Sequence, residues 1–169
     1  LGSASGEVNT LALTGDTGNV VFTGTVGANA NLELGAVSIV SAADVTASST
    51  IEAASLVQTA GTGTTTLRDN VTTTAAAGVN ITAANINLDG LTIAASGDGV
   101  ARFAGATVLD GATVITTTGT GAITFTSTLG SAANEDNTLA LTGNTGNVVF
   151  TGAVGAGANL ELGAVSIVS

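Results

Sequence analysis

Short stretches of this chain alternate apolar and polar residues and end at Gly, Asn or Asp. The stretches at 11–13, 85–88, 91–93 and 122–125 show the pattern most plainly. Alternation of this length between turn residues is typical of β-strands that bury one face. No stretch carries apolar residues at helical spacing over a useful length, so the sequence predicts an all-β fold built from short strands.

A turn motif accompanies these strands. It consists of a pair of glycines followed by a Phe or Leu, and the large residue always lies four positions after the second Gly. The five instances are Gly15/Gly18/Phe22, Gly61/Gly63/Leu67, Gly97/Gly99/Phe103, Gly119/Gly121/Phe125 and Gly143/Gly146/Phe150. Because Gly turns the chain at low steric cost, the motif predicts a corner and then a strand that carries one bulky residue inward.

A much longer period is superimposed on these strands. Residues 1–41 recur as residues 129–169, shifted by 128 positions without a gap, and 35 of the 41 aligned pairs are identical. We interpret residues 1–128 as one full repeat unit and residues 129–169 as the start of the next, continuous with the first, in a window from a longer tandem array. The differences lie outside the apolar strand centres, at Ser5/Ala133, Gly6/Asn134, Val8/Asp136, Asp16/Asn144, Thr25/Ala153 and Asn29/Gly157.

A shorter period lies inside the repeat. An Asp follows a strand end at Asp69, Asp89 and Asp110, and the spacing between these positions is almost constant. About six coils of ~21 residues per repeat predict a β-solenoid, a parallel β-helix in which stacked coils bury an apolar column together. Extended outward, the series divides the repeat unit into six comparable steps, with the further markers Gly2, Gly24, Asp44 and Gly130.

Stacked coils bring equivalent side chains above one another, with neighbouring strands ~4.8 Å apart. Phe22, Phe103 and Phe125 are therefore predicted to stack in the interior. The alternative architecture is a β-sandwich that spans one whole repeat unit and is repeated as beads. The sandwich is less favoured, because it usually has a richer aromatic core than four Phe and because a sub-period of one coil length is not expected in it.

Composition narrows the range of functions. The net charge of −10, with two basic residues, argues against nucleic acid as a partner, because phosphates require a basic surface. No run approaches 18 apolar residues, which argues against insertion into a membrane. The chain has no His, Cys, Lys or Tyr. Without these residues the usual nucleophile and base pairs cannot form, so we expect no enzyme and no cofactor.

The sequence runs LALTGDTGNVVFTGTVGANANLELGAVSIVSAADVT and SLVQTAGTGTTTLRD resemble the repeat regions of filamentous-haemagglutinin-type exoproteins. They are also similar to the giant β-strand-repeat surface proteins of bacteria and to autotransporter passengers. The resemblance covers the whole chain and rests on composition and rhythm. It implies a right-handed β-helix, secretion across the outer membrane, and a role in adhesion, biofilm matrix or fibre formation.

Two arrangements of polar residues could carry binding. If Asp69, Asp89 and Asp110 lie one coil apart, three carboxylates line one edge at ~4.8 Å intervals and could bind a divalent cation such as calcium. The alternative, which we favour, is that Asp-Gly is a turn dipeptide whose carboxylate points into water. The runs at 64–66, 72–74 and 116–118 could form a flat Thr array that binds ice, but their spacing is irregular. No residue is assigned a catalytic, cofactor-binding or metal-binding role.

The sequence thus predicts a non-enzymatic structural module of a long secreted bacterial fibre or surface filament, located outside the cell or on its surface. Self-association, end to end or lateral, is expected because solenoid ends expose unpaired strand edges. The alternative function is the stalk of a cell-surface adhesin whose binding tip lies outside this chain. A carbohydrate-active β-helix is a third and less favoured hypothesis, since the carboxylates are scattered along the sequence.

Overall fold

The computed structural model describes residues 1–27, 33–156 and 160–169, and these residues form strands and turns without a helix. The strands are β1 (Leu11–Thr14), β2 (Val20–Phe22), β3 (Leu34–Ser41), β4 (Val45–Ala47), β5 (Ile51–Gln58), β6 (Thr64–Leu67), β7 (Val71–Thr73), β8 (Val79–Leu88), β9 (Thr92–Ala95), β10 (Ala101–Leu109), β11 (Thr113–Thr117), β12 (Ile123–Phe125), β13 (Leu129–Ser131), β14 (Leu139–Thr142), β15 (Val148–Phe150) and β16 (Val165–Val168).

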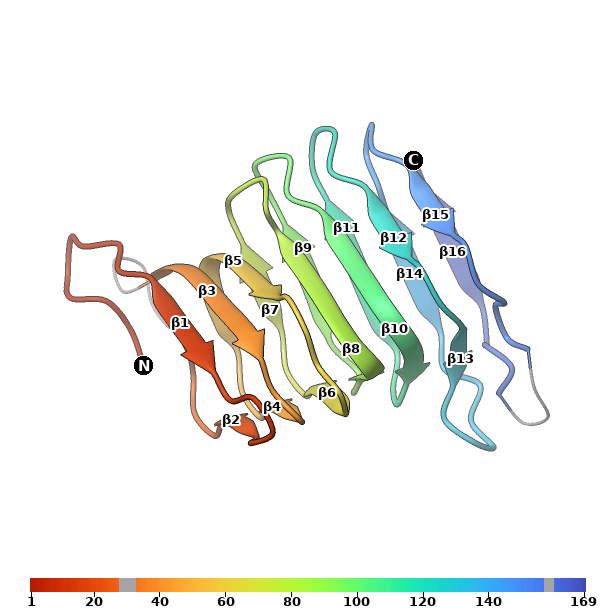
Figure 1. The fold of residues 1–169 in the computed structure, drawn as a ribbon. Coiled ribbons are helices and arrows are strands. Elements are labelled where there is room, and N and C mark those ends of the chain that lie inside the picture. The colour runs from red at the N-terminus through yellow and green to blue at the C-terminus, as the bar shows by residue number, and fades with distance from the viewer. Residues whose placement is uncertain (28–32, 157–159) are drawn as a thin grey trace.

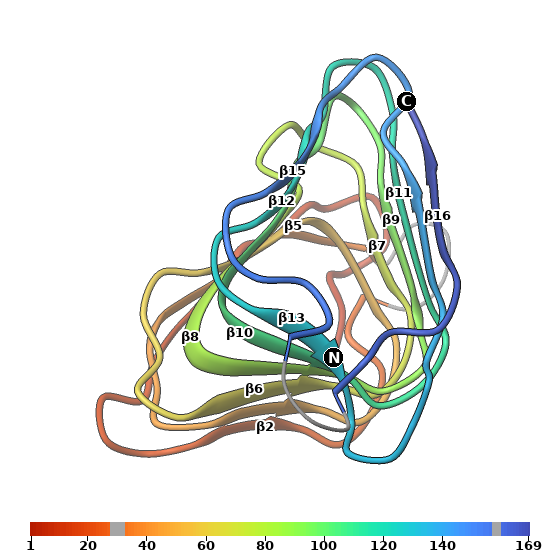
Figure 2. The same cartoon turned by 90° about the vertical axis from the view of Figure 1, so that its right-hand side faces the viewer.

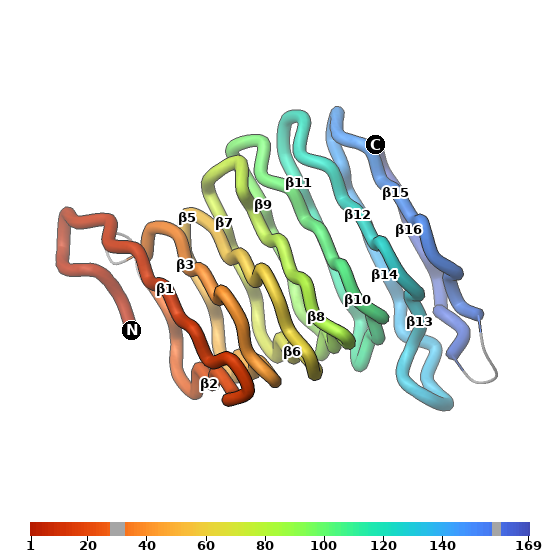
Figure 3. Tube along the Cα trace, viewed as in Figure 1, coloured from red at the N-terminus to blue at the C-terminus, as the bar shows by residue number. Residues whose placement is uncertain are grey.

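All the strand pairs are parallel, and each joins one coil to the next. The chain makes about seven turns, with its first coil at one end of the stack and its last coil at the other (Figures 1 and 3). The prediction of an all-β parallel solenoid with about six coils per repeat is confirmed. The strands join in one sheet because a coil can satisfy its backbone groups only with the coils before and after it.

Three ladders run along the stack, and each forms one side of a roughly triangular coil (Figure 2). Side A comprises residues 11–14, 37–41, 56–58, 79–82, 101–104, 123–125 and 148–150. Side B comprises residues 20–22, 45–47, 64–67, 85–88, 106–109 and 129–131. Side C comprises residues 51–53, 71–73, 92–95, 113–117, 139–142 and 165–168.

The predicted alternation of apolar and polar residues sets which side chains point inward. In β7, Val71 and Thr73 are buried and Thr72 between them is exposed. The long strands β8 and β10 turn from side A to side B without a loop, at a register shift between Ala104 and Ala106. Gly105 lies at this bend, where an added Cβ would come within 2.3 Å of the Ala83 carbonyl oxygen. A glycine therefore lets two neighbouring coils bend at the same point.

An aromatic stack occupies part of the interior on side A. The rings of Phe103 and Phe125 lie 5.0 Å apart between centroids, and those of Phe125 and Phe150 lie 5.5 Å apart. Phe22 faces the interior too, but from side B, where its ladder partner is Ala47. The prediction that Phe22 belongs to the stack is therefore wrong, because the same motif places its large residue on two different sides.

The corner markers are also only partly those predicted from the sequence. Gly24 follows side B, as the Asp markers do, but Asp44 lies at the corner before side B and Gly130 lies inside β13. The differences between repeats that fall on described residues lie in turns or irregular segments, whereas Asn29/Gly157 is outside the described residues. At Gly6/Asn134, both residues have φ between 65° and 81°, so the exchange keeps a residue type that tolerates this backbone.

Candidate functional site

Most carboxylates of this chain lie at the corners of the coil or in irregular segments, and the charged side chains on the strands are Glu52 of β5 and Arg102 of β10. The outward residues of side C include Thr72, Thr92, Val114, Ala140 and Ser166, one from each of five successive coils. All seven Asp residues lie between strands, at Asp16, Asp44, Asp69, Asp89, Asp98, Asp110 and Asp136. The corners are therefore where polar chemistry can occur.

Corner side chains bond to the backbone of the next coil. The Asp44 carboxylate accepts a hydrogen bond from the Thr64 N–H at 2.8 Å, and its own N–H donates to the Asn19 side-chain oxygen at 3.1 Å. At other corners, Asn70 Oδ1 accepts from the Thr92 N–H at 2.7 Å and Asp98 Oδ1 accepts from the Thr120 N–H at 2.8 Å. These bonds couple successive coils. Sequence reasoning missed them, since the bonded residues are 20 to 25 positions apart and occur at more than one corner.

The row of three carboxylates, which is the less favoured hypothesis, does not form. Asp89 and Asp110 are equivalent, because their N–H groups donate to Leu67 and Leu88 at the end of side B. The equivalent residue one coil earlier is Arg68, and Asp69 lies one position later. The Asp69 carboxylate accepts from the Asn70 N–H at 2.7 Å. Within residues 1–27, 33–156 and 160–169, no group of three or more acidic, His or Cys residues could hold a metal ion. The calcium hypothesis therefore gains no support.

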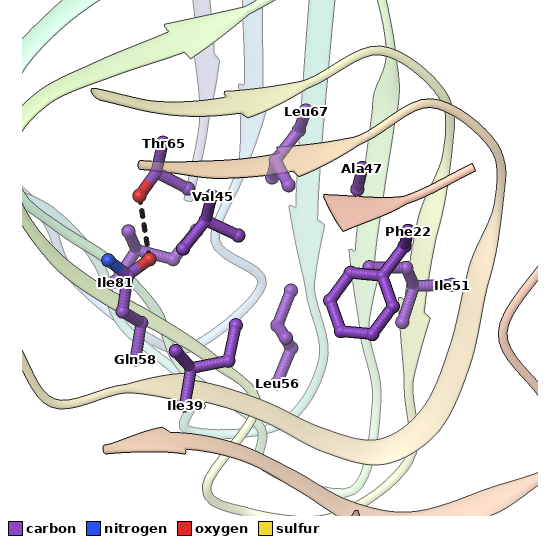
Figure 4. A pocket seen from close by; sticks show the side chains of 10 residues that line it. All are labelled: Phe22, Ile39, Val45, Ala47, Ile51, Leu56, Gln58, Thr65, Leu67 and Ile81. Carbon is purple, nitrogen blue, oxygen red and sulfur yellow. Dashed lines mark hydrogen bonds between the residues drawn. The ribbon is translucent and has the colours of Figure 1, made fainter. Parts of the chain in front are cut away.

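The interior contains a polar pair beside a small cavity. The Thr65 hydroxyl donates to Gln58 Oε1 at 2.7 Å, and both side chains are buried (Figure 4). The adjacent cavity has a volume of about 10 Å³ and is lined by Phe22, Ile39, Val45, Ala47, Ile51, Leu56, Gln58, Thr65, Leu67 and Ile81. This space is at the lower limit for a single water molecule, so it cannot hold an organic substrate.

A larger hollow of about 690 Å³ lies at the last coil. Its lining is Asn144, Thr145, Gly146, Asn147, Val148, Phe150, Ile167 and Ser169, and contains no ionisable side chain. The first repeat contains the same apolar segment in a covered position. Val37 and Ile39 are 0% and 1% exposed beneath β5, whereas their equivalents Val165 and Ile167 are 42% and 48% exposed. The hollow is therefore the open end of the stack.

No family model, curated protein or solved structure matches this chain. Its function must therefore be inferred from its fold and its surfaces. In the part of the chain that the structure describes, no helix is long and apolar enough to cross a membrane.

Proposed function

We propose that this chain is a non-enzymatic structural module of a long bacterial filament, secreted or displayed at the cell surface, as in the filamentous-haemagglutinin-type exoproteins that it resembles. The observation that carries the proposal is the unbroken ladder across the repeat junction. β13 begins the second repeat and pairs with β10 of the first, and β14 pairs with β11. A stack that passes through the junction in this way can be lengthened by adding repeats.

The distribution of polar groups supports a structural role. The Asp and Asn side chains at the corners accept hydrogen bonds from the next coil. Each satisfies a backbone N–H group that would otherwise bond to water. The two arginines and the acidic residues are dispersed along the chain, and the hollow at the open end has no ionisable lining. Acid–base catalysis requires such groups at one place.

Self-association through the open end forms part of the same proposal. The exposed residues Val165 and Ile167 lie on an edge strand with unpaired backbone groups, which is a template for another parallel strand. The occupant that this edge fits is a further coil of the same repeat, because β5 covers the identical residues Val37 and Ile39. Within a longer array the rest of the repeat would supply such a coil, and where an array ends a second copy would supply it in a filament assembled end to end.

Electron microscopy on arrays of one, two and three repeats tests the structural role. We expect straight rods that lengthen by ~29 Å per repeat, since a repeat adds about six coils and neighbouring strands are ~4.8 Å apart. Compact beads joined by flexible links, or lengths that do not increase in proportion, would contradict the proposal.

A second measurement separates the filament from a stalk. We expect the chain to form end-to-end oligomers in light scattering as its concentration rises, and Ile167→Lys to abolish them because a charge blocks the edge. Val114→Lys, on an exposed strand face away from the open end, is the matched control and should still associate. A chain that stays monomeric at all concentrations would favour the adhesin stalk and overturn end-to-end assembly.

A further inference from the structure

The two copies of the repeated sequence have the same local structure. Leu11 in β1 pairs with Val37, and its equivalent Leu139 in β14 pairs with Val165. The turn before each strand is also preserved. Ser3 Oγ accepts a hydrogen bond from the Asn9 N–H at 2.9 Å, and Ser131 Oγ accepts one from the Asn137 N–H at 3.0 Å. The copies are thus equivalent in how each coil continues into the next.

The same copies nevertheless lie on different sides of the stack. β1 belongs to side A, whereas β14 has the same sequence and belongs to side C, where it pairs with β11. β2 belongs to side B, whereas its equivalent β15 belongs to side A. The Phe residues show the consequence, because Phe150 continues the aromatic stack from Phe125 and Phe22 does not.

The displacement follows from the number of strand positions in a repeat. From β1 on side A, the chain passes through sides A, B and C in order. It returns to side A six times, and the sixth return is β15. β14 occupies side C immediately before that point. The repeat unit is therefore one strand position short of six complete coils.

We infer that successive repeats of this sequence turn by one side of the coil, so that an array presents each surface group on all three sides in turn and returns to register after three repeats. The outward residues Val21 and Val149 are equivalent in sequence and already point from sides B and A. A partner that recognises one surface of the repeat would meet that surface from three directions along the filament.

The physical reason is that the three sides accept the same segments. Each side uses the same parallel hydrogen bonds and requires only alternating inward apolar residues. The Gly-pair motif shows that one segment type fits more than one side, since its large residue is Leu67 on side B and Phe103 on side A. A repeat is consequently not required to contain a whole number of coils.

Disulfide trapping in this chain tests the register. The chain has no native Cys, so every disulfide that forms joins the two introduced residues. The double variant Val114→Cys with Ala140→Cys places thiols on directly paired strand positions. Neighbouring strands are ~4.8 Å apart, which is within the Cα separation that a disulfide spans. We expect nearly complete cross-linking under mild oxidation, read by mass and by mobility without reductant. The pair Thr124→Cys with Ala140→Cys should remain uncross-linked.

A repeat of whole coils would give the opposite result. It would return β14 to side A above β12, and Ala140 would then lie beside Thr124 and not beside Val114. The pair Thr92→Cys with Val114→Cys is the control, because it lies within one repeat and links in either register. Cross-linking of Thr124 to Ala140, or no cross-linking of Val114 to Ala140 while the control pair links, would overturn the inference. Either register gives a continuous rod, so this result is independent of the filament proposal.

Discussion

The substitution Gly121→Ala tests how closely the coils approach at a corner. Gly121 lies between sides C and A, one coil after Gly99, and its Cβ would lie 2.2 Å from the Gly99 carbonyl oxygen and 2.9 Å from the carbonyl carbon. Ordinary contact begins near 3.4 Å, so the two backbones would have to separate by about 1 Å. That separation would break the adjacent hydrogen bond from the Ala101 N–H to the Ala122 carbonyl, which is 2.9 Å long.

The magnitude follows from these contacts. Overpacking costs about 1–3 kcal/mol, and each lost ladder hydrogen bond costs about 1 kcal/mol. We therefore expect Gly121→Ala to lower the free energy of unfolding by about 2–4 kcal/mol, or Tm by roughly 5–15 °C for a chain of this size. Urea and thermal unfolding followed by far-UV circular dichroism measure both quantities.

Gly24→Ala is the matched control for this prediction. Gly24 also lies at a corner, but no heavy atom of the described residues lies within 4 Å of its added Cβ. Its effect should stay within about 0.5 kcal/mol. Equal effects of the two substitutions, or a stable Gly121→Ala variant, would refute the argument from close coil contact.

Three further substitutions give distinct outcomes in the same unfolding assays. Phe125→Ala should lower the free energy of unfolding by about 3–5 kcal/mol, because Phe125 is 1% exposed and lies between two rings. Phe22→Ala should lower it less, because Phe22 is only partly buried and stacks on no other described ring. Equal losses would contradict the conclusion that Phe22 lies outside the aromatic stack. Thr73→Val should stabilise the chain by about 1 kcal/mol, since the buried Thr73 hydroxyl has no hydrogen-bond partner in the described part of the chain, and destabilisation would show that this hydroxyl does bond in solution. Asp44→Ala should lower the free energy of unfolding by about 1–2 kcal/mol, because it removes the acceptor for the Thr64 N–H. Asp44→Asn keeps an oxygen at this place and should retain most of the stability. A fully stable alanine variant would show that this corner bond contributes nothing to stability.

The corners show where sequence reasoning reached its limit. The Gly pairs correctly indicate turns, but the Asp series treats Asp69, Asp89 and Asp110 as equivalent when Asp69 is one position out of register. Spacing along the chain cannot detect this, because the corners differ in length. The intercoil bond from Thr64 to Asp44 was missed for a related reason, since it depends on which turn of one coil faces which strand of the next.

Patterns along the chain were sufficient to establish the strands, the inward apolar positions, the parallel stack and the near-identity of the two repeats. These properties are local: alternation with a period of two selects strands, Gly selects corners, and coils of about 21 residues can bury their apolar faces only by stacking. The side on which each strand lies is visible only in the three-dimensional fold. That assignment depends on the count of every preceding strand and on bends without loops, such as those in β8 and β10. Identical segments such as β1 and β14 therefore form the same strand on different sides of the coil.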